Sequence, residues 1–164
     1  MKFKLATLAL ASLFAVGAQA NTTDWGVHDT LEIGVSLVPV GAFEDFYLFS
    51  TLTDQAAFST AVANNLTDVL GVQGGMVQLY KEAGAVDTLV GSFNFNGFTG
   101  NISHAFGTLS AGSYYYDVTG TGTGTLGGFY SITSTVSPVP EPQTYALFLG
   151  GLVGIGFMLR RRQS

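Results

Sequence analysis

The stretch FEDFYLF, residues 43–49, decides our interpretation of the fold. In a β-strand every second side chain lies on one face, and here that face carries Phe43, Asp45, Tyr47 and Phe49. The opposite face is also largely apolar, which indicates a central strand rather than an edge strand. A carboxylate among aromatic rings needs donors, so we expect Asp45 to accept hydrogen bonds from loop backbone or from the surroundings of Tyr47. A second interpretation makes Asp45 a calcium ligand.

The rest of the central sequence consists of short aromatic and β-branched runs broken by Gly, Asn and Asp, a composition typical of β-structure. These runs predict seven strands, namely Leu31–Val38, Phe43–Leu52, Gly75–Tyr80, Thr88–Phe95, Ile102–Phe106, Ser113–Val118 and Gly128–Thr135. Seven short strands with turn residues between them predict an all-β fold, a single antiparallel β-sandwich. We expect Asp54–Asn64 to form a helical turn or a loop.

The first twenty residues have the three parts of a secretory signal in order. Lys2 and Lys4 supply a positive n-region, and an apolar h-region of twelve residues follows. Ala18-Gln19-Ala20 then matches the small-x-small pattern that signal peptidase cuts after. We therefore expect a signal peptide over residues 1–20, cleavage after Ala20, and an exported domain over residues 21–137.

Charge and cysteine content exclude several classes of function. Between residues 21 and 137 the chain has ten acidic residues and one basic residue, Lys81, so the exported domain carries a net charge of −9. Binding to nucleic acid depends on neutralising phosphates with basic side chains, so no nucleic-acid partner is expected. The chain has no cysteine, which excludes disulfides, thiol catalysis and cysteine-ligated metal sites.

The C-terminus has three parts with different physical properties. Val139-Pro140-Glu141-Pro142 stays extended, because each proline fixes its own φ and disfavours helix in the preceding residue. Residues 145–159 are apolar or glycine and, as a helix of about 22 Å, would be short against a hydrocarbon core of about 30 Å. Arg160, Arg161 and Arg162 would hold the C-terminus in the cytoplasm. We expect a transmembrane segment over residues 145–159 with the domain on the far side; a permanent anchor without processing is the alternative.

This order of parts resembles the PEP-CTERM sorting signal of Gram-negative bacteria, over residues 139–164. The resemblance implies that an exosortase, a membrane cysteine transpeptidase-like enzyme, cuts near the motif. The protein would then be an exosortase substrate that passes through the inner membrane and reaches the cell surface or the extracellular matrix. Hosts of this system typically make exopolysaccharide. The label of ice-binding-protein domain that such tails sometimes receive describes the sorting tail.

Two further resemblances concern the domain. Phe43, Asp45, Tyr47 and Phe49 resemble the Phe-x-Asp-x-Phe signature of a PEP-CTERM family, with Tyr47 where that family usually has Phe. The same stretch, together with residues 109–120 (LSAGSYYYDVTG), is similar to two strands of bacterial pre-peptidase C-terminal domains. Those domains are small jelly-roll-like sandwiches, so the resemblance implies that fold here. Neither family implies a defined activity.

Catalytic patterns are scarce. His28 and His104 are the only histidines, and neither has a nucleophile pattern beside it. Carboxylate pairs of the glycosidase kind depend on separation in space, and nothing in the sequence selects one. The run Thr119–Thr125 alternates with glycine. In an extended strand its threonine hydroxyls would form a row that could bind ice or a sugar polymer, but alternating glycine favours a flexible loop.

We therefore expect a non-enzymatic surface or matrix protein with a structural or adhesive role in an exopolysaccharide layer or biofilm, with no cofactor. Its processing partners would be signal peptidase and exosortase, and exopolysaccharide would be its binding partner. A carbohydrate-binding module is the alternative, with candidate platforms at Tyr114, Tyr115, Tyr116 and Tyr130. A secreted hydrolase or an ice-binding protein is a weaker hypothesis.

Overall fold

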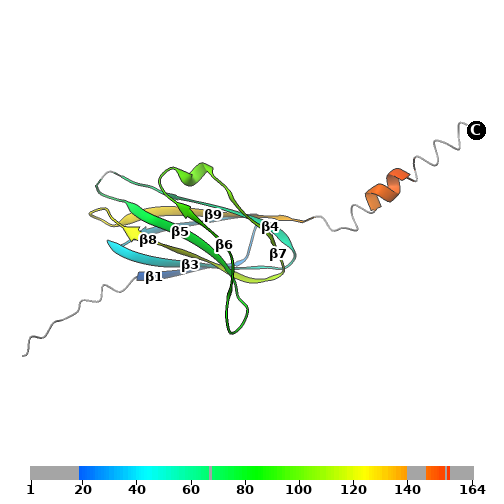
Figure 1. The fold of residues 1–164 in the computed structure, drawn as a ribbon, viewed down its shortest axis with the longest axis horizontal. Coiled ribbons are helices and arrows are strands. Elements are labelled where there is room, and N and C mark those ends of the chain that lie inside the picture. Colours follow the sequence, from blue (N-terminus) through cyan, green and yellow to red (C-terminus); the bar gives the residue numbers. More distant parts are fainter. Residues whose placement is uncertain (1–18, 67, 140–146, 154, 156–164) are drawn as a thin grey trace, which may run out of the picture.

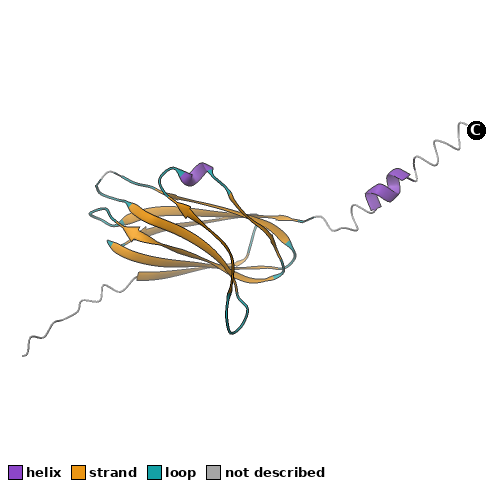
Figure 2. Ribbon diagram, in the orientation of Figure 1, coloured by secondary structure: helices purple, strands orange, loops and turns teal. Residues whose placement is uncertain are grey.

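The computed structural model describes residues 19–66, 68–139, 147–153 and 155 (Figure 1). Within these residues the chain forms nine strands and one short 3₁₀ turn, η1 (Thr99–Asn101), and β-structure dominates (Figure 2). The strands are β1 (Gln19–Val27), β2 (Leu31–Val38), β3 (Gly41–Thr51), β4 (Gln55–Ala63), β5 (Val72–Lys81), β6 (Thr88–Phe95), β7 (His104–Leu109), β8 (Gly112–Gly122) and β9 (Gly128–Pro138).

The strands form two sheets, one in the order β1-β3-β8-β5-β6 and the other in the order β2-β9-β4-β7. From β2 onward the ladders join β2 with β9, β3 with β8, β4 with β7 and β5 with β6. Apart from β5 and β6, which form a hairpin within one sheet, consecutive strands from β2 onward lie in opposite sheets. The chain is thus one long antiparallel hairpin that is wound into a sandwich, which is the jelly-roll arrangement. The predicted two-layer all-β fold is confirmed.

Two parts of the prediction are wrong. Asp54–Asn64 is neither a helical turn nor a loop, because β4 covers most of it in a central position between β9 and β7. Its inward positions include Ala57, Ser59 and Ala61, small residues that lack the β-branched or aromatic signal of a strand. The sheet is also not wholly antiparallel: β1, which the sequence did not predict, pairs in parallel with β3.

Strand ends also differ from the prediction. The strand expected at Ile102–Phe106 is β7, which begins and ends later, at His104 and Leu109. The Thr119–Thr125 run is only partly a loop, since β8 continues to Gly122. The Thr123 backbone N–H then donates to the Gly71 carbonyl at 2.8 Å, so a hydrogen-bonded turn follows the strand.

The core contains large aromatic side chains from both sheets, most of them from the five-stranded sheet and one, Tyr130, from β9 of the other. The five-stranded sheet contributes buried rings such as Phe49, Tyr114 and Tyr116, and Phe49 stacks on Tyr116 with 5.3 Å between ring centroids. On the facing sheet, β2 has a glycine, Gly34. A Cβ there would lie 2.3 Å from Cε1 of Tyr47, so the Tyr47 ring occupies the space that any other residue would need. At this point a glycine in one sheet makes room for a large ring of the other.

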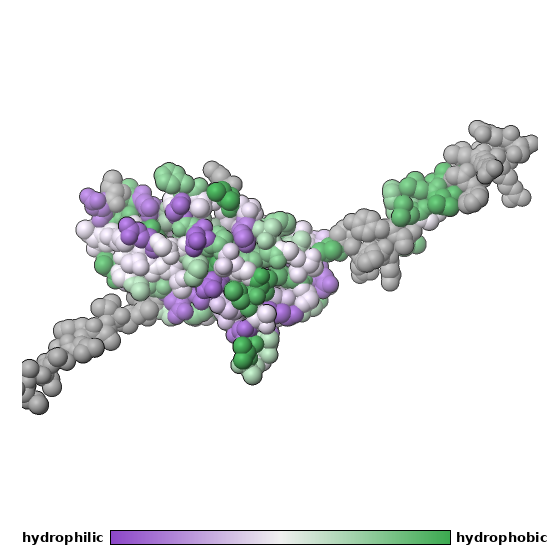
Figure 3. Space-filling view, in the orientation of Figure 1, coloured by the Kyte–Doolittle hydropathy of each residue, from purple (hydrophilic) through white to green (hydrophobic). Residues whose placement is uncertain are grey.

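Residues 147–153 and 155 are helical and apolar (Figures 2 and 3). No helix among the described residues is both long and hydrophobic enough to span a bilayer. The transmembrane segment expected over 145–159 is therefore not confirmed, and residues 145, 146, 154 and 156–159 of it lie outside the described residues, as do residues 1–18 of the expected signal peptide. The other two residues of that peptide, Gln19 and Ala20, begin β1.

Candidate functional site

The residues of the Phe-x-Asp-x-Phe-like stretch lie together on the inner face of β3. Phe43, Asp45, Tyr47 and Phe49 are each at most 3% exposed. β3 lies between β1 and β8, which makes it an internal strand of its sheet, as the apolar pattern on both faces predicts.

Asp45 accepts two hydrogen bonds. The backbone N–H of Asn21 donates to Oδ1 at 3.2 Å, and the Tyr130 hydroxyl donates to Oδ2 at 2.7 Å. The hydroxyls of Tyr130 and Tyr47 are 3.1 Å apart. Burial raises the pKa of both tyrosines, and the Asp45 carboxylate adds to the effect, so both hydroxyls keep their protons at neutral pH. The Tyr130 donor lies in the surroundings of Tyr47, as the sequence led us to expect, whereas the backbone donor belongs to strand β1 and not to a loop.

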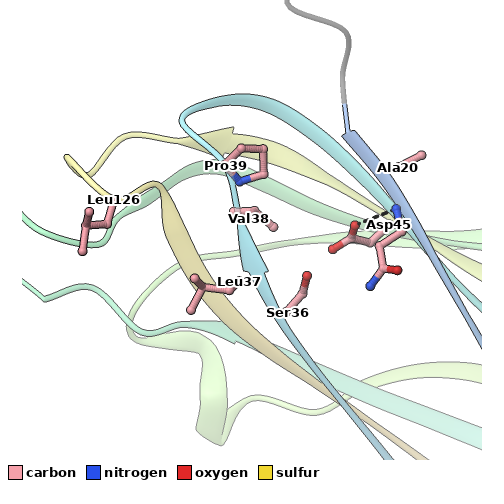
Figure 4. A pocket seen from close by; sticks show the side chains of 8 residues that line it. Ala20, Ser36, Leu37, Val38, Pro39, Asp45 and Leu126 are labelled. Carbon is pink, nitrogen blue, oxygen red and sulfur yellow. Dashed lines mark hydrogen bonds between the residues drawn. The ribbon is translucent and has the colours of Figure 1, made fainter.

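A cavity of about 390 Å³ opens beside Asp45, between the edge strands of the two sheets (Figure 4). Ala20 and Asn21 of β1 line one side, and Ser36 and Val38 of β2 line the other. No group of three or more His, Cys, Asp or Glu side chains gathers anywhere in the described part of the chain. The calcium interpretation of Asp45 therefore has no ligand cluster to support it.

His28 takes part in a buried chain of hydrogen bonds. Its Nδ1 bonds the Asp29 carbonyl, which can only accept, so Nδ1 carries a proton, and Nε2 lies 2.7 Å from the Ser134 hydroxyl oxygen. The Tyr116 hydroxyl lies 2.9 Å from the same Ser134 oxygen. Ser134 of β9 is fully buried, and its contact with Tyr116 of β8 connects the two sheets, while its contact with His28 ties the β1–β2 connection to the core.

Three aromatic side chains form a partly exposed cluster on the outer face of the five-stranded sheet, which we call the aromatic platform: Phe46, Tyr80 and Tyr115. The rings of Tyr80 and Tyr115 stack with 5.2 Å between centroids and 16° between planes, and Phe46 meets Tyr115 edge-on at 6.0 Å. A shallow hollow of about 260 Å³ lies there, lined by Thr22, Phe46, Leu48, Glu82 and Tyr115.

Carboxylates surround the platform. The Tyr115 hydroxyl donates to Asp87 Oδ2 at 3.0 Å, and burial together with this bond raises the pKa of Tyr115 to about 12. Asp117 lies opposite Phe46 in the β3–β8 ladder. Burial and the nearby Glu44 charge raise the pKa of Asp117 to about 6, and its Oδ1 is buried without a hydrogen-bond partner in the protein. The platform thus combines three partly exposed rings with the exposed carboxylate of Asp87.

Of the four tyrosines that the sequence offers as candidate platforms, only Tyr115 lies on the outer face. Tyr114, Tyr116 and Tyr130 are at most 2% exposed and belong to the core, so they cannot be binding platforms. Tyr115 alone of the four faces outward, and its ring neighbours, Phe46 and Tyr80, were missed. The alternation of a strand separates residue 115 from 114 and 116, but only the register of three strands brings its ring partners beside it.

The processing residues lie at the ends of the described structure. Ala20 is an exposed residue of β1, and Val139 follows β9, whereas Ala18, Pro140, Glu141, Pro142 and the arginines 160–162 are outside the described residues. Residues 138–162 match the PEP-CTERM protein-sorting motif. This chain carries a PEP-CTERM sorting motif. The motif implies an exported, membrane-anchored precursor that an exosortase processes. The match does not include residues 43–49, so the Phe-x-Asp-x-Phe subtype stays a prediction.

Two solved structures are similar to the PEP-CTERM chain. The pre-peptidase C-terminal domain of a collagenase from Bacillus anthracis is 18% identical, with 73% of this chain and 97% of that chain covered and a TM-score of 0.46. PliG of Aeromonas hydrophila, a periplasmic inhibitor of g-type lysozyme, is 11% identical, with 73% and 100% covered and a TM-score of 0.42. A comparison with curated proteins finds no match.

Proposed function

We propose that this PEP-CTERM protein is a non-enzymatic component of the cell surface or extracellular matrix, and that it binds an uncharged exopolysaccharide through the aromatic platform. Signal peptidase removes residues 1–20, the precursor is held in the inner membrane, and exosortase then releases the domain from its tail. The observation that carries the binding proposal is the stacked Tyr80–Tyr115 pair with carboxylates beside it on an open sheet face.

The chemistry of the platform suits a sugar chain. A pyranose ring has an apolar C–H face that packs on an aromatic ring, and its hydroxyls donate to carboxylates such as Asp87 and Asp117. The net charge of −9 repels acidic polymers, which favours a neutral polysaccharide.

The non-enzymatic part of the proposal is supported by the surroundings of the two histidines. The His28–Ser134 pair is buried in the core. His104 stacks on Phe93 with 5.1 Å between ring centroids and also contacts Phe106, so its ring is a packing element.

Binding can be tested by affinity electrophoresis of the mature domain in gels that contain neutral or acidic polysaccharides. We expect retardation by at least one neutral polymer, and the Tyr115→Ala variant should bind at least tenfold more weakly, which corresponds to about 1.4 kcal/mol. Phe58→Ala is the matched control, because Phe58 is an aromatic residue 39% exposed on β4 of the other sheet. Equal loss in both variants, or no retardation by any polymer, would contradict the proposal.

A further inference from the structure

Asp45 is a buried carboxylate without a basic partner. It is 3% exposed, and both hydrogen bonds that it accepts come from neutral donors. The one basic side chain between residues 21 and 137, Lys81, bonds Ser110 at 2.6 Å and lies over the Tyr114 ring. On β8, Asp45 pairs with Val118 and Lys81 pairs with Tyr114. The two positions are four residues apart, which is roughly 13 Å along the strand. A buried charge of this kind is costly unless a cation pairs with it.

The backbone nitrogen that donates to Asp45 belongs to Asn21, the residue that follows the expected cleavage site. Asn21 is the register partner of Asp45 in the parallel β1–β3 pair, and its nitrogen is 3.2 Å from Oδ1. Ala20, the last residue of the expected signal peptide, lines the cavity next to Asp45 (Figure 4). Cleavage between these two residues would therefore change the chemistry of a nitrogen that already contacts the buried carboxylate.

We propose that signal-peptide removal creates the missing cation: the new α-amine of Asn21 forms an ion pair with Asp45 and locks β1 onto the mature sandwich. The inference rests on the predicted cleavage after Ala20. Hydrolysis of the Ala20–Asn21 peptide bond uses one water, which leaves a carboxylate on departing Ala20 and an amine on Asn21. At neutral pH the proton that the new Ala20 carboxyl group releases balances the one that the amine takes up to become a –NH₃⁺ group.

Replacing the Asn21 amide with an ammonium strengthens the hydrogen bond that this nitrogen already donates to Asp45. A hydrogen bond from an ammonium to a carboxylate is roughly twice as strong as one from a neutral amide. β1 is an edge strand that pairs only with β3 in the sheet, so its attachment depends strongly on this end. Its Trp25 ring lies 5.0 Å from the Tyr47 ring, so the fluorescence of this single tryptophan reports whether β1 is docked.

A two-by-two comparison tests the pair. One chain runs from Asn21 to Ser164 with a free α-amine, released from a cleavable fusion, and the other keeps Gln19 and Ala20; both are studied in the same detergent. We expect the free amine to raise the folding equilibrium constant, measured by Trp25 fluorescence in urea, at least tenfold. In the isosteric Asp45→Asn background the gain should fall below twofold. An equal gain in both backgrounds would overturn the proposal.

A second measurement needs no substitution. The chain from Asn21 to Ser164 has two amines, the α-amine and Lys81, and an ordinary α-amine, with a pKa of about 8 against about 10 for lysine, reacts faster with acylating reagents at pH 7. Because Asp45 holds the α-amine protonated, we expect it to react at least tenfold more slowly in the folded protein than in urea, with Lys81 as the internal standard. Equal rates would overturn the proposal, as would a secreted product whose N-terminus is not Asn21.

Discussion

The Tyr130→Phe substitution tests the hydrogen-bond network around the buried carboxylate. In the protein the Tyr130 hydroxyl donates to Asp45 Oδ2 at 2.7 Å and lies 3.1 Å from the Tyr47 hydroxyl. The substitution removes one oxygen and keeps the ring that stacks on Phe43 with 5.5 Å between centroids. Any loss of stability therefore reports on the hydroxyl and not on the packing of the ring.

The expected loss of stability follows from two groups that lose their partner, the Asp45 carboxylate and the Tyr47 hydroxyl. A hydrogen bond to a charged group contributes about 1.5–3 kcal/mol, and an unsatisfied buried hydroxyl costs about 1–3 kcal/mol. Phenylalanine has no hydroxyl to remove from water on folding, and this saving offsets part of the loss. We expect the free energy of unfolding to fall by about 3 kcal/mol, and Tm to fall by about 12 °C in a domain of this size.

Urea unfolding followed by Trp25 fluorescence measures this difference. Tyr114→Phe is the matched control: Tyr114 is equally buried, but its hydroxyl donates to the neutral Ser110 carbonyl at 2.7 Å, so we expect a loss of about 1 kcal/mol. Equal losses in the two variants would refute the reasoning, because the network around Asp45 would then contribute no more than an ordinary hydrogen bond.

Two further substitutions test the core and the outer face. Gly34→Ala places a Cβ 2.3 Å from Cε1 of Tyr47 and should lower the free energy of unfolding by about 2–3 kcal/mol; an unchanged urea midpoint would contradict the packing described. Asp117→Asn should stabilise the protein by about 1–2 kcal/mol at pH 8 and by almost nothing at pH 4. The folded pKa of about 6 lies above the ordinary 3.8, so ionisation of Asp117 costs stability as the pH rises between these values, and partial exposure lowers the cost. A gain independent of pH, seen in thermal unfolding, would contradict this assignment.

Strands with strong side-chain patterns could be predicted from the sequence. FEDFYLF alternates large inward residues, and β3 lies almost where the pattern places it. β4 could not be recognised, because its inward residues are small to fit beneath the rings of the other sheet, and that need is visible only when both sheets are present. β1 begins within the last two residues of the expected signal peptide, and its parallel pairing with β3 depends on contacts far apart in the sequence.

Sites formed by one continuous stretch could also be predicted from the sequence, whereas a site formed by several strands could not. The sorting tail is a local signal, so its parts could be recognised in order along the chain. The aromatic platform depends on the register of β3, β8 and β5, which places Tyr115 beside Leu48 on one side and Tyr80 on the other. A run of three tyrosines predicts alternation but does not say which members face outward.

The mass of the protein recovered from the cell surface and the medium tests the central claim most directly. Exosortase processing predicts a product that ends near Glu141 and lacks the apolar segment and the arginines 160–162. Deletion of the exosortase should leave the uncut chain in the inner membrane. A surface or secreted product that retains Arg160–Arg162 would contradict the account.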